Sequence, residues 1–241
     1  LAAHDPAALA AILPPGAATD EESLEARMAR HATHLTAYQN QALAGRYRAL
    51  LDRVAAAEEE LLGEARDLTL AAAESYVRLL SYKDEYEVAR LLSQASFLDG
   101  LRRQFAGDFK LRFHLAAPLV SGRDGATGQP KKRRYGSAIL PLLKLLARGK
   151  GLRGTPFDPF GHTAERRAER QLIAEFEASV ERILAGLAAD NRALAVEIAE
   201  LPLEIKGFGH IKSAAMGRAR ARRAALLAGF DRRPAMAIAA E

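Results

Sequence analysis

Residues 23–42 read SLEARMARHATHLTAYQNQA and carry a large or apolar side chain at about every third or fourth position. This spacing lines one face of an α-helix, so the segment is expected to lay that face on a neighbouring helix. After a one-residue shift the stripe continues over residues 47–61, which predicts one long helix. The stripe of the first part consists of Leu24, Met28, His31, Leu35, Tyr38 and Ala42.

Two further segments repeat the helical spacing. Residues 67–105 predict a second helical stretch, interrupted near Asp99-Gly100, and residues 164–201 carry a third stripe. We therefore expect a mostly α fold with long antiparallel helices. The prolines and glycine near the start mark residues 1–18 as a linker or docking arm. Residues 19–230 would form a single helical domain, and residues 231–241 a tail.

One segment has the alternation of a β-strand. In residues 109–115, FKLRFHL, apolar side chains alternate with basic ones, so one face is apolar and the other basic. A lone strand is not stable and needs a partner. The candidate partner is residues 203–208, just after Pro202. The prediction is a small β element within the helical fold.

Composition limits the class of protein. The 241 residues carry a net charge of +5 and contain no cysteine, which excludes disulfides and cysteine-ligated metal or iron–sulfur sites within this segment. No apolar run approaches the ~20 residues of a membrane span, and the start does not resemble a signal peptide. We expect a cytoplasmic protein. The basic runs 131–134 and 218–223 lack interleaved aromatic residues, so nucleic acid is not an expected partner.

A proline- and glycine-rich loop precedes the third stripe. Residues 153–170 read RGTPFDPFGHTAERRAER, in which a stiff loop feeds a helix with Thr163 as the expected N-cap. A guanidinium cluster here matches the geometry of a carboxylate or phosphate. The favoured alternative is that Asp158, Glu165 and Glu169 already pair with the arginines. The cluster consists of Arg153, Arg166, Arg167 and Arg170.

A second basic turn lies at residues 205–212, IKGFGHIK. Two glycines around Phe208 leave the backbone open, so the turn could bind phosphate at a helix N-terminus, although a structural turn is favoured. Lys206, His210 and Lys212 complete the set of candidate anion-binding residues.

The centre of the second helical stretch, residues 82–91, reads YKDEYEVARL. Its charges beside two tyrosines favour a helix contact built on ion pairs. General acid–base chemistry by Glu87 or Lys83 would require burial. His31 and His34 have ligand spacing but no third ligand nearby, so neither a metal site nor catalytic residues are expected. The interface or structural motif consists of Tyr82, Lys83, Asp84, Glu85, Tyr86, Glu87, Arg90 and Asp158.

Five blocks occur together and in order: residues 38–40, 82–91, 113–118, 152–170 and 206–212. Over roughly residues 23–212 the chain resembles the C-terminal domain, of unassigned function, of fused bacterial indolepyruvate ferredoxin oxidoreductases. The resemblance implies an enzyme that decarboxylates indolepyruvate and related 2-oxoacids to acyl-CoA and passes electrons to ferredoxin. Thiamine diphosphate, magnesium and iron–sulfur clusters are implied for the preceding domains, and no cofactor for this segment.

The resemblance leads us to expect an accessory domain that is structural rather than catalytic. Its partners would be the preceding catalytic domains and a second copy of the enzyme. The alternative is an anion-binding module for CoA phosphates or the substrate carboxylate, at the arginines and lysines named above. A further variant is a docking surface for acidic ferredoxin on the basic face of the strand.

Overall fold

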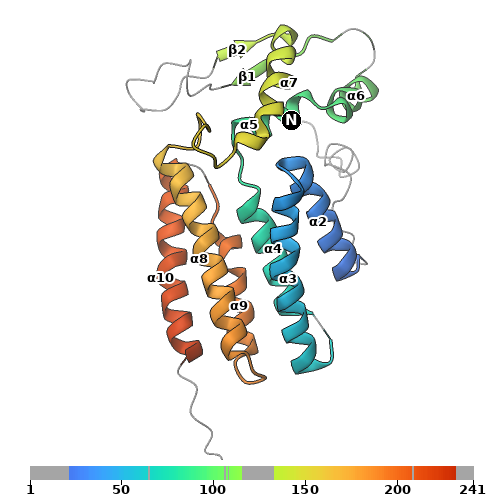
Figure 1. The fold of residues 1–241 in the computed structure, drawn as a ribbon. Coiled ribbons are helices and arrows are strands. Elements are labelled where there is room, and N and C mark those ends of the chain that lie inside the picture. Colours follow the sequence, from blue (N-terminus) through green and yellow to red (C-terminus); the bar gives the residue numbers. More distant parts are fainter. Residues whose placement is uncertain are drawn as a thin grey trace, which may run out of the picture. The chain divides into compact units, whose positions relative to one another are not determined.

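The computed structural model describes residues 22–64, 66–105, 107, 109–115, 133–207 and 209–231. Helices dominate, and the strands found in these residues form one two-stranded sheet (Figure 1). The prediction of a mostly α fold with a small β element is confirmed. The predicted arm 1–18, residues 131 and 132, and the tail beyond Asp231 lie outside the described residues.

The chain groups into two compact units. Unit 1 contains residues 83–160, and unit 2 contains the described residues on either side, 22–82 and 161–231. Unit 1 is therefore inserted into the sequence of unit 2. The predicted domain 19–230 contains both. Within the described ranges, no helix is both long and apolar enough to cross a membrane.

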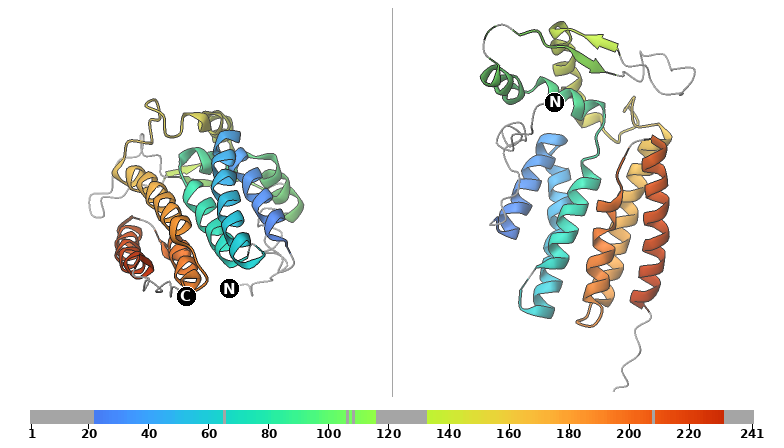
Figure 2. Two further views of the ribbon diagram at one scale, coloured as in Figure 1. Left: turned by 60° about the horizontal axis from the view of Figure 1, so that its bottom comes forward. Right: turned by 180° about the vertical axis from the view of Figure 1, so that it is seen from behind.

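Unit 2 is a bundle of long helices that run side by side (Figure 2). Within it α4 packs on α3 and α9, and α10 packs on α9. The shared core includes the stacked rings of Tyr47, Tyr76 and Phe176. The described helices are α2 (Leu24–Tyr38), α3 (Gln41–Leu62), α4 (Asp67–Leu80), α8 (Ala164–Gly186), α9 (Arg192–Glu204) and α10 (Gly209–Asp231).

The stripe that the sequence predicts over residues 24–61 lies on two helices rather than one. Met28, His31, Leu35 and Tyr38 are buried on α2. The expected single helix over residues 24–61 is wrong, because Asn40 ends the first segment and caps the second by accepting a hydrogen bond from Leu43 N at 2.9 Å. The predicted one-residue shift follows Ala42, which lies inside α3 and is exposed, so the shift does not mark the break.

Unit 1 begins where the second helical stretch is broken. The predicted interruption near Asp99-Gly100 is wrong, since both residues lie inside α6 (Ala95–Gln104). The breaks occur instead at residues 81–84 and at Gln94, which separate α4, α5 (Glu85–Ser93) and α6. Asp84 explains the first break, because its side chain caps α5 by accepting from Glu87 N.

The strand prediction is confirmed in part. β1 (Phe113–Leu115) is shorter than the predicted 109–115 and pairs antiparallel with β2 (Arg133–Tyr135), with His114 opposite Arg134. The candidate partner 203–208 is wrong: α9 continues to Glu204, and the buried side chain of Ile205 packs with Leu172 and Met216. Unit 1 is completed by η1 (Ser137–Ile139), α7 (Leu140–Arg148) and η2 (Gly149–Leu152).

A buried carboxylate joins α3 to α4. Glu58 is fully buried, and its oxygens accept hydrogen bonds from the backbone N–H groups of Arg66, Leu68 and Thr69, each at 2.9 Å, and from the Thr69 hydroxyl. Burial alone raises the pKa of Glu58, but the hydrogen bonds from Leu68, Thr69 and Arg66 outweigh it, so the net pKa is lowered. Glu58 therefore serves as the N-terminal cap of α4, at which Arg66 makes no side-chain cap bond.

Replacing Glu58 by Gln should destabilise unit 2 by about 1–3 kcal/mol, because an amide cannot accept all the bonds that the carboxylate accepts. The Glu58 contribution should be complete above the unfolded-state pKa of about 4.3 and disappear as the pH falls through the lower folded-state pKa. Urea unfolding of the full chain between neutral and acid pH measures both effects. The exposed neighbour Glu60→Gln should change stability by less than about 0.5 kcal/mol; an equal loss there would contradict this role for Glu58.

Candidate functional site

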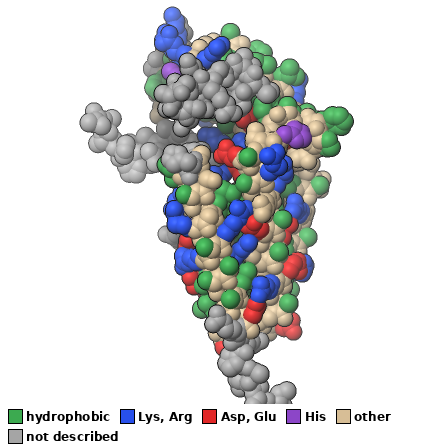
Figure 3. Space-filling model, turned by 90° about the vertical axis from the view of Figure 1, so that its left-hand side faces the viewer, with side chains coloured by type: hydrophobic (Ala, Val, Ile, Leu, Met, Phe, Trp, Pro, Cys, Tyr) green, Lys and Arg blue, Asp and Glu red, His purple; other side chains and the backbone are tan. Residues whose placement is uncertain are grey.

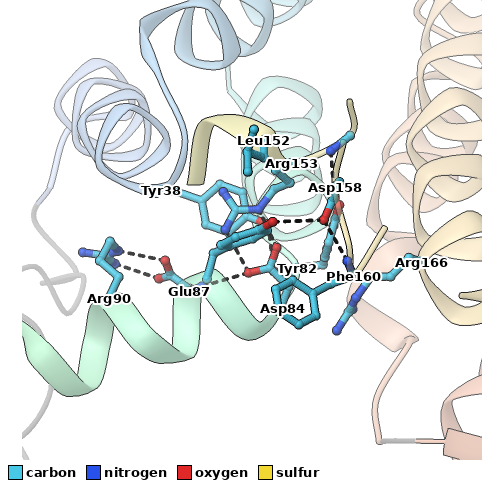
Figure 4. Close-up of polar contacts among 12 residues, drawn as sticks. Tyr38, Tyr82, Asp84, Glu87, Arg90, Leu152, Arg153, Asp158, Phe160 and Arg166 are labelled. Carbon is cyan, nitrogen blue, oxygen red and sulfur yellow. Dashed lines mark hydrogen bonds and ion pairs between the residues drawn. The ribbon is translucent and has the colours of Figure 1, made fainter. Parts of the chain in front are cut away.

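A buried ion pair in unit 1 connects two of the sequence blocks. The Arg153 guanidinium donates to the Asp84 carboxylate through Nε at 2.5 Å and Nη2 at 2.8 Å (Figure 4). The side chains of both residues are 3% exposed. Because Asp84 also caps α5, this one carboxylate fixes the start of a helix and anchors the loop after η2.

Beside this pair, Asp158 organises a turn. Its carboxylate accepts hydrogen bonds from the Tyr86 hydroxyl at 3.2 Å and from the backbone N–H groups of Gly154 and Phe160 at 3.0 and 3.1 Å. Gly154 has a φ of +77°, a left-handed conformation that favours glycine. The Tyr86 ring meets Phe160 edge to face, and the Arg153 guanidinium lies 5.5 Å from the Tyr86 ring centroid. These hydrogen bonds and ring contacts therefore fix the conformation of the turn.

The remaining charged residues of block 82–91 lie on or before α5. Glu87 is buried and pairs with Arg90 through two hydrogen bonds of 2.7 and 2.8 Å. Lys83 is exposed and precedes the helix, whereas Glu85 is half-buried in its first turn. Asp84 and Glu87 therefore form ion pairs, and the Tyr86 ring packs on Phe160, in a motif of the kind expected from ion pairs and tyrosines.

The charged and phenolic groups of this cluster interact with one another. Burial, reinforced by Asp158, raises the pKa of Tyr86 to about 12, so the phenol keeps its proton at neutral pH. Asp84 and Glu87 are each held by an arginine. Lys150, which the sequence did not single out, has a pKa lowered by burial and by the charges of Arg90 and Arg153. The arrangement holds the start of α5 and the loop after η2 together.

In unit 2, two of the candidate anion-binding residues share one carboxylate. Glu169 is buried and pairs with Arg166 from its own helix and with Lys212 from α10. The Arg166 guanidinium also lies 5.3 Å from the centroid of the Tyr82 ring. Thr163 caps α8 as predicted, by accepting from Arg166 N. Here the predicted pairing of Glu169 with an arginine is confirmed.

The other arginines among the candidates also have partners within the chain. Arg167 and Arg170 donate to the carbonyl oxygens of His162 and Gly161, at 2.6 and 2.9 Å. Lys206 is exposed after α9, and His210 belongs to the first turn of α10. Arg153 belongs to unit 1 and pairs with Asp84, which is not among the acids that the sequence favours as partners of the arginine cluster. Each of these arginines therefore contacts a group of the protein itself, and ligand binding by the candidate residues stays a prediction.

Three of the four arginines in the basic run 218–223 on α10 form ion pairs within unit 2. Arg220 and Arg223 each contact Glu175 at 3.0 Å, and Arg222 pairs with acids of α9. Figure 3 shows basic and acidic side chains interspersed over the helices of this unit. Among the described residues no cluster of three or more His, Cys, Asp or Glu side chains could hold a metal ion. His31 instead bonds through Nδ1 to the Tyr47 hydroxyl at 2.8 Å.

The Asp84–Arg153 pair should dominate the local stability of unit 1. Arg153→Met leaves the Asp84 carboxylate buried without its cation and should cost about 3–5 kcal/mol. Asp84→Asn retains a helix cap, so the Asp84→Asn/Arg153→Met double variant should recover much of that loss. Amide hydrogen exchange of residues 84–93 and 153–160 in the full chain measures the effect.

A matched control is the exposed Asp99–Arg102 pair of α6, also in unit 1. Arg102→Met should cost less than about 1 kcal/mol, because water screens an exposed pair. If Arg102→Met and Arg153→Met reduced protection equally, the buried pair would not have the role assigned to it.

Comparison with models of protein families places most of the chain in a family. A family model described as a family of unknown function (DUF6537) matches residues 24–225. No curated protein and no solved structure matches the chain. The matched range includes all five sequence blocks and nearly all of the bundle in unit 2. On this match the chain belongs to the family of unknown function DUF6537.

Proposed function

We propose that this chain is an accessory domain of an indolepyruvate ferredoxin oxidoreductase, with a structural rather than a catalytic role. The five ordered sequence blocks support the enzyme class. The structural role rests on the buried Asp84–Arg153 pair, because it joins two of these blocks through their own charged side chains. Charges held in this way fix segments in place and are not free to bind substrate.

In this proposal the domains of a longer cytoplasmic enzyme have different tasks. The preceding domains hold thiamine diphosphate, magnesium and the iron–sulfur clusters, and this chain supports them or contacts a second subunit. The sequence contains no cysteine, so the cluster thiolates come from elsewhere in the enzyme. An anion site at Arg166 and Lys212 is a weaker alternative, since a CoA phosphate or substrate carboxylate would first have to displace Glu169.

A second candidate role, docking of acidic ferredoxin, is supported by the charge of unit 1. Residues 83–160 contain fifteen Lys and Arg against seven Asp and Glu, a net charge of +8 compared with +5 for the whole chain. Exposed cations lie along the sheet, with His114 paired in register with Arg134. Lys110, Arg112 and Arg134 have no ion-pair partner among the described residues. Such a surface attracts an acidic protein.

The structural role predicts that chemistry survives when the buried pair is replaced. The gene product that contains this chain, purified with an affinity tag, should reduce methyl viologen with indolepyruvate, CoA and thiamine diphosphate. The Asp84→Asn/Arg153→Met variant should keep the rate per folded enzyme within about twofold, because no transition-state contact is removed. A rate loss of about a hundredfold or more at unchanged stability would make these residues catalytic. Absence of activity in the native protein would end the proposal.

The docking role predicts a loss that depends on the electron acceptor. Lys110→Gln/Arg112→Gln/Arg134→Gln should raise the KM for ferredoxin severalfold, with an effect that fades as salt is added, because charge steering is screened. The rate with methyl viologen should not change. Lys206→Gln/Arg218→Gln removes exposed cations from unit 2 and serves as the control. Equal effects of both variants on ferredoxin would contradict docking on the sheet.

A further inference from the structure

A surface pocket of about 450 Å³ lies within unit 1, between α6 and α7. Its size falls in the range of pockets that bind small molecules. Ala95 and Leu98 of α6 provide an apolar part of the wall. The pocket contains none of the arginines and lysines that sequence reasoning selected as anion-binding candidates, so it is a separate feature.

The charged side chains of the pocket are predominantly basic. Lys144 and Arg148 of α7 line it, together with Asp99 and Arg102 of α6. Asp99 and Arg102 neutralise each other through a contact of 2.7 Å. Lys144 and Arg148 are exposed and have no hydrogen bond or ion pair to any residue that the structure describes. The pocket therefore carries two uncompensated positive charges.

The spacing of the two cations puts them on the same side of α7. Residues four apart are neighbours on a helix surface, and like charges at this spacing repel each other. No nearby acid in the sequence relieves the repulsion, since residues 125–157 contain eight Lys and Arg and no Asp or Glu. Both side chains line the pocket, so an anion bound there would be contacted by both. Binding a doubly charged anion would remove the repulsion.

We propose that this pocket binds a small molecule that carries a phosphate monoester. A phosphate ester has a charge of about −2 at neutral pH, which matches the two free cations. Arg148 can bind two phosphate oxygens with its planar fork, and Lys144 adds a point charge one turn away. The organic part of the ligand lies against Leu98 and Ala95. The proposal does not depend on the oxidoreductase assignment, because it uses only residues of unit 1.

The test uses phenyl phosphate as the probe, titrated into the full chain at low ionic strength by isothermal calorimetry. We expect saturable binding of one molecule per chain. Lys144→Gln and Arg148→Gln should each weaken binding by about tenfold, the effect of losing one charge-assisted contact. Arg133→Gln/Arg134→Gln is the matched control, since it removes two exposed charges from β2 in the same unit, outside the pocket. The control should bind within about twofold of the original chain.

A second probe tests the charge match. Phenyl sulfate has the shape of phenyl phosphate but only one negative charge, so it should bind roughly tenfold more weakly. Circular dichroism and thermal unfolding of each variant establish that it is folded. Three results would overturn the proposal: no saturable binding by the original chain, equal weakening in the pocket and control variants, or equal affinity for the two probes. The second would mean diffuse attraction to a basic unit rather than a site.

Discussion

The buried contact between Asp84 and Arg153 is the constraint on which unit 1 depends. Its two hydrogen bonds join the start of α5 to the loop that follows η2. A bidentate pair of this kind has a strict geometry, and once water is removed neither partner can be left without the other. The Asp158 turn and the Tyr86–Phe160 contact lie against it, so one charge pair determines how the two motif blocks are positioned.

Local patterns predicted most of the fold. The stripe from Met28 to Tyr38, the helix of residues 164–186 and its Thr163 cap all follow from spacing within a few turns. The stripe runs past the break at Asn40 to Ala42, so periodicity alone predicts one continuous helix. A side chain that can cap a helix competes with the helical backbone, and apolar periodicity alone does not reveal which conformation wins.

Partners far apart in the sequence could not be predicted. Arg153 and Asp84 are 69 residues apart in the sequence, whereas Asp158 is a nearer acid in the sequence. The sequence predicts residues 203–208 as the partner of β1, but the strand that pairs with β1 begins at Arg133. Lys144 and Arg148 are visible as neighbours on one helix, but only the packing of unit 1 shows that α6 lies across the pocket from them. Spacing indicates a face, whereas identifying the residue opposite it requires the tertiary structure.

The insertion of unit 1 into the sequence of unit 2 has a kinetic consequence. The ion pairs that join the two halves of the bundle link residues far apart in the chain, 125 positions for Asp67 with Arg192 and 131 for Arg46 with Glu177. All-helical proteins usually fold fast because their contacts are local, and rates fall as contact order rises. This bundle has helices that form locally but a core that closes over a long loop. Its folding rate should therefore be lower than that of a helical bundle joined by short loops.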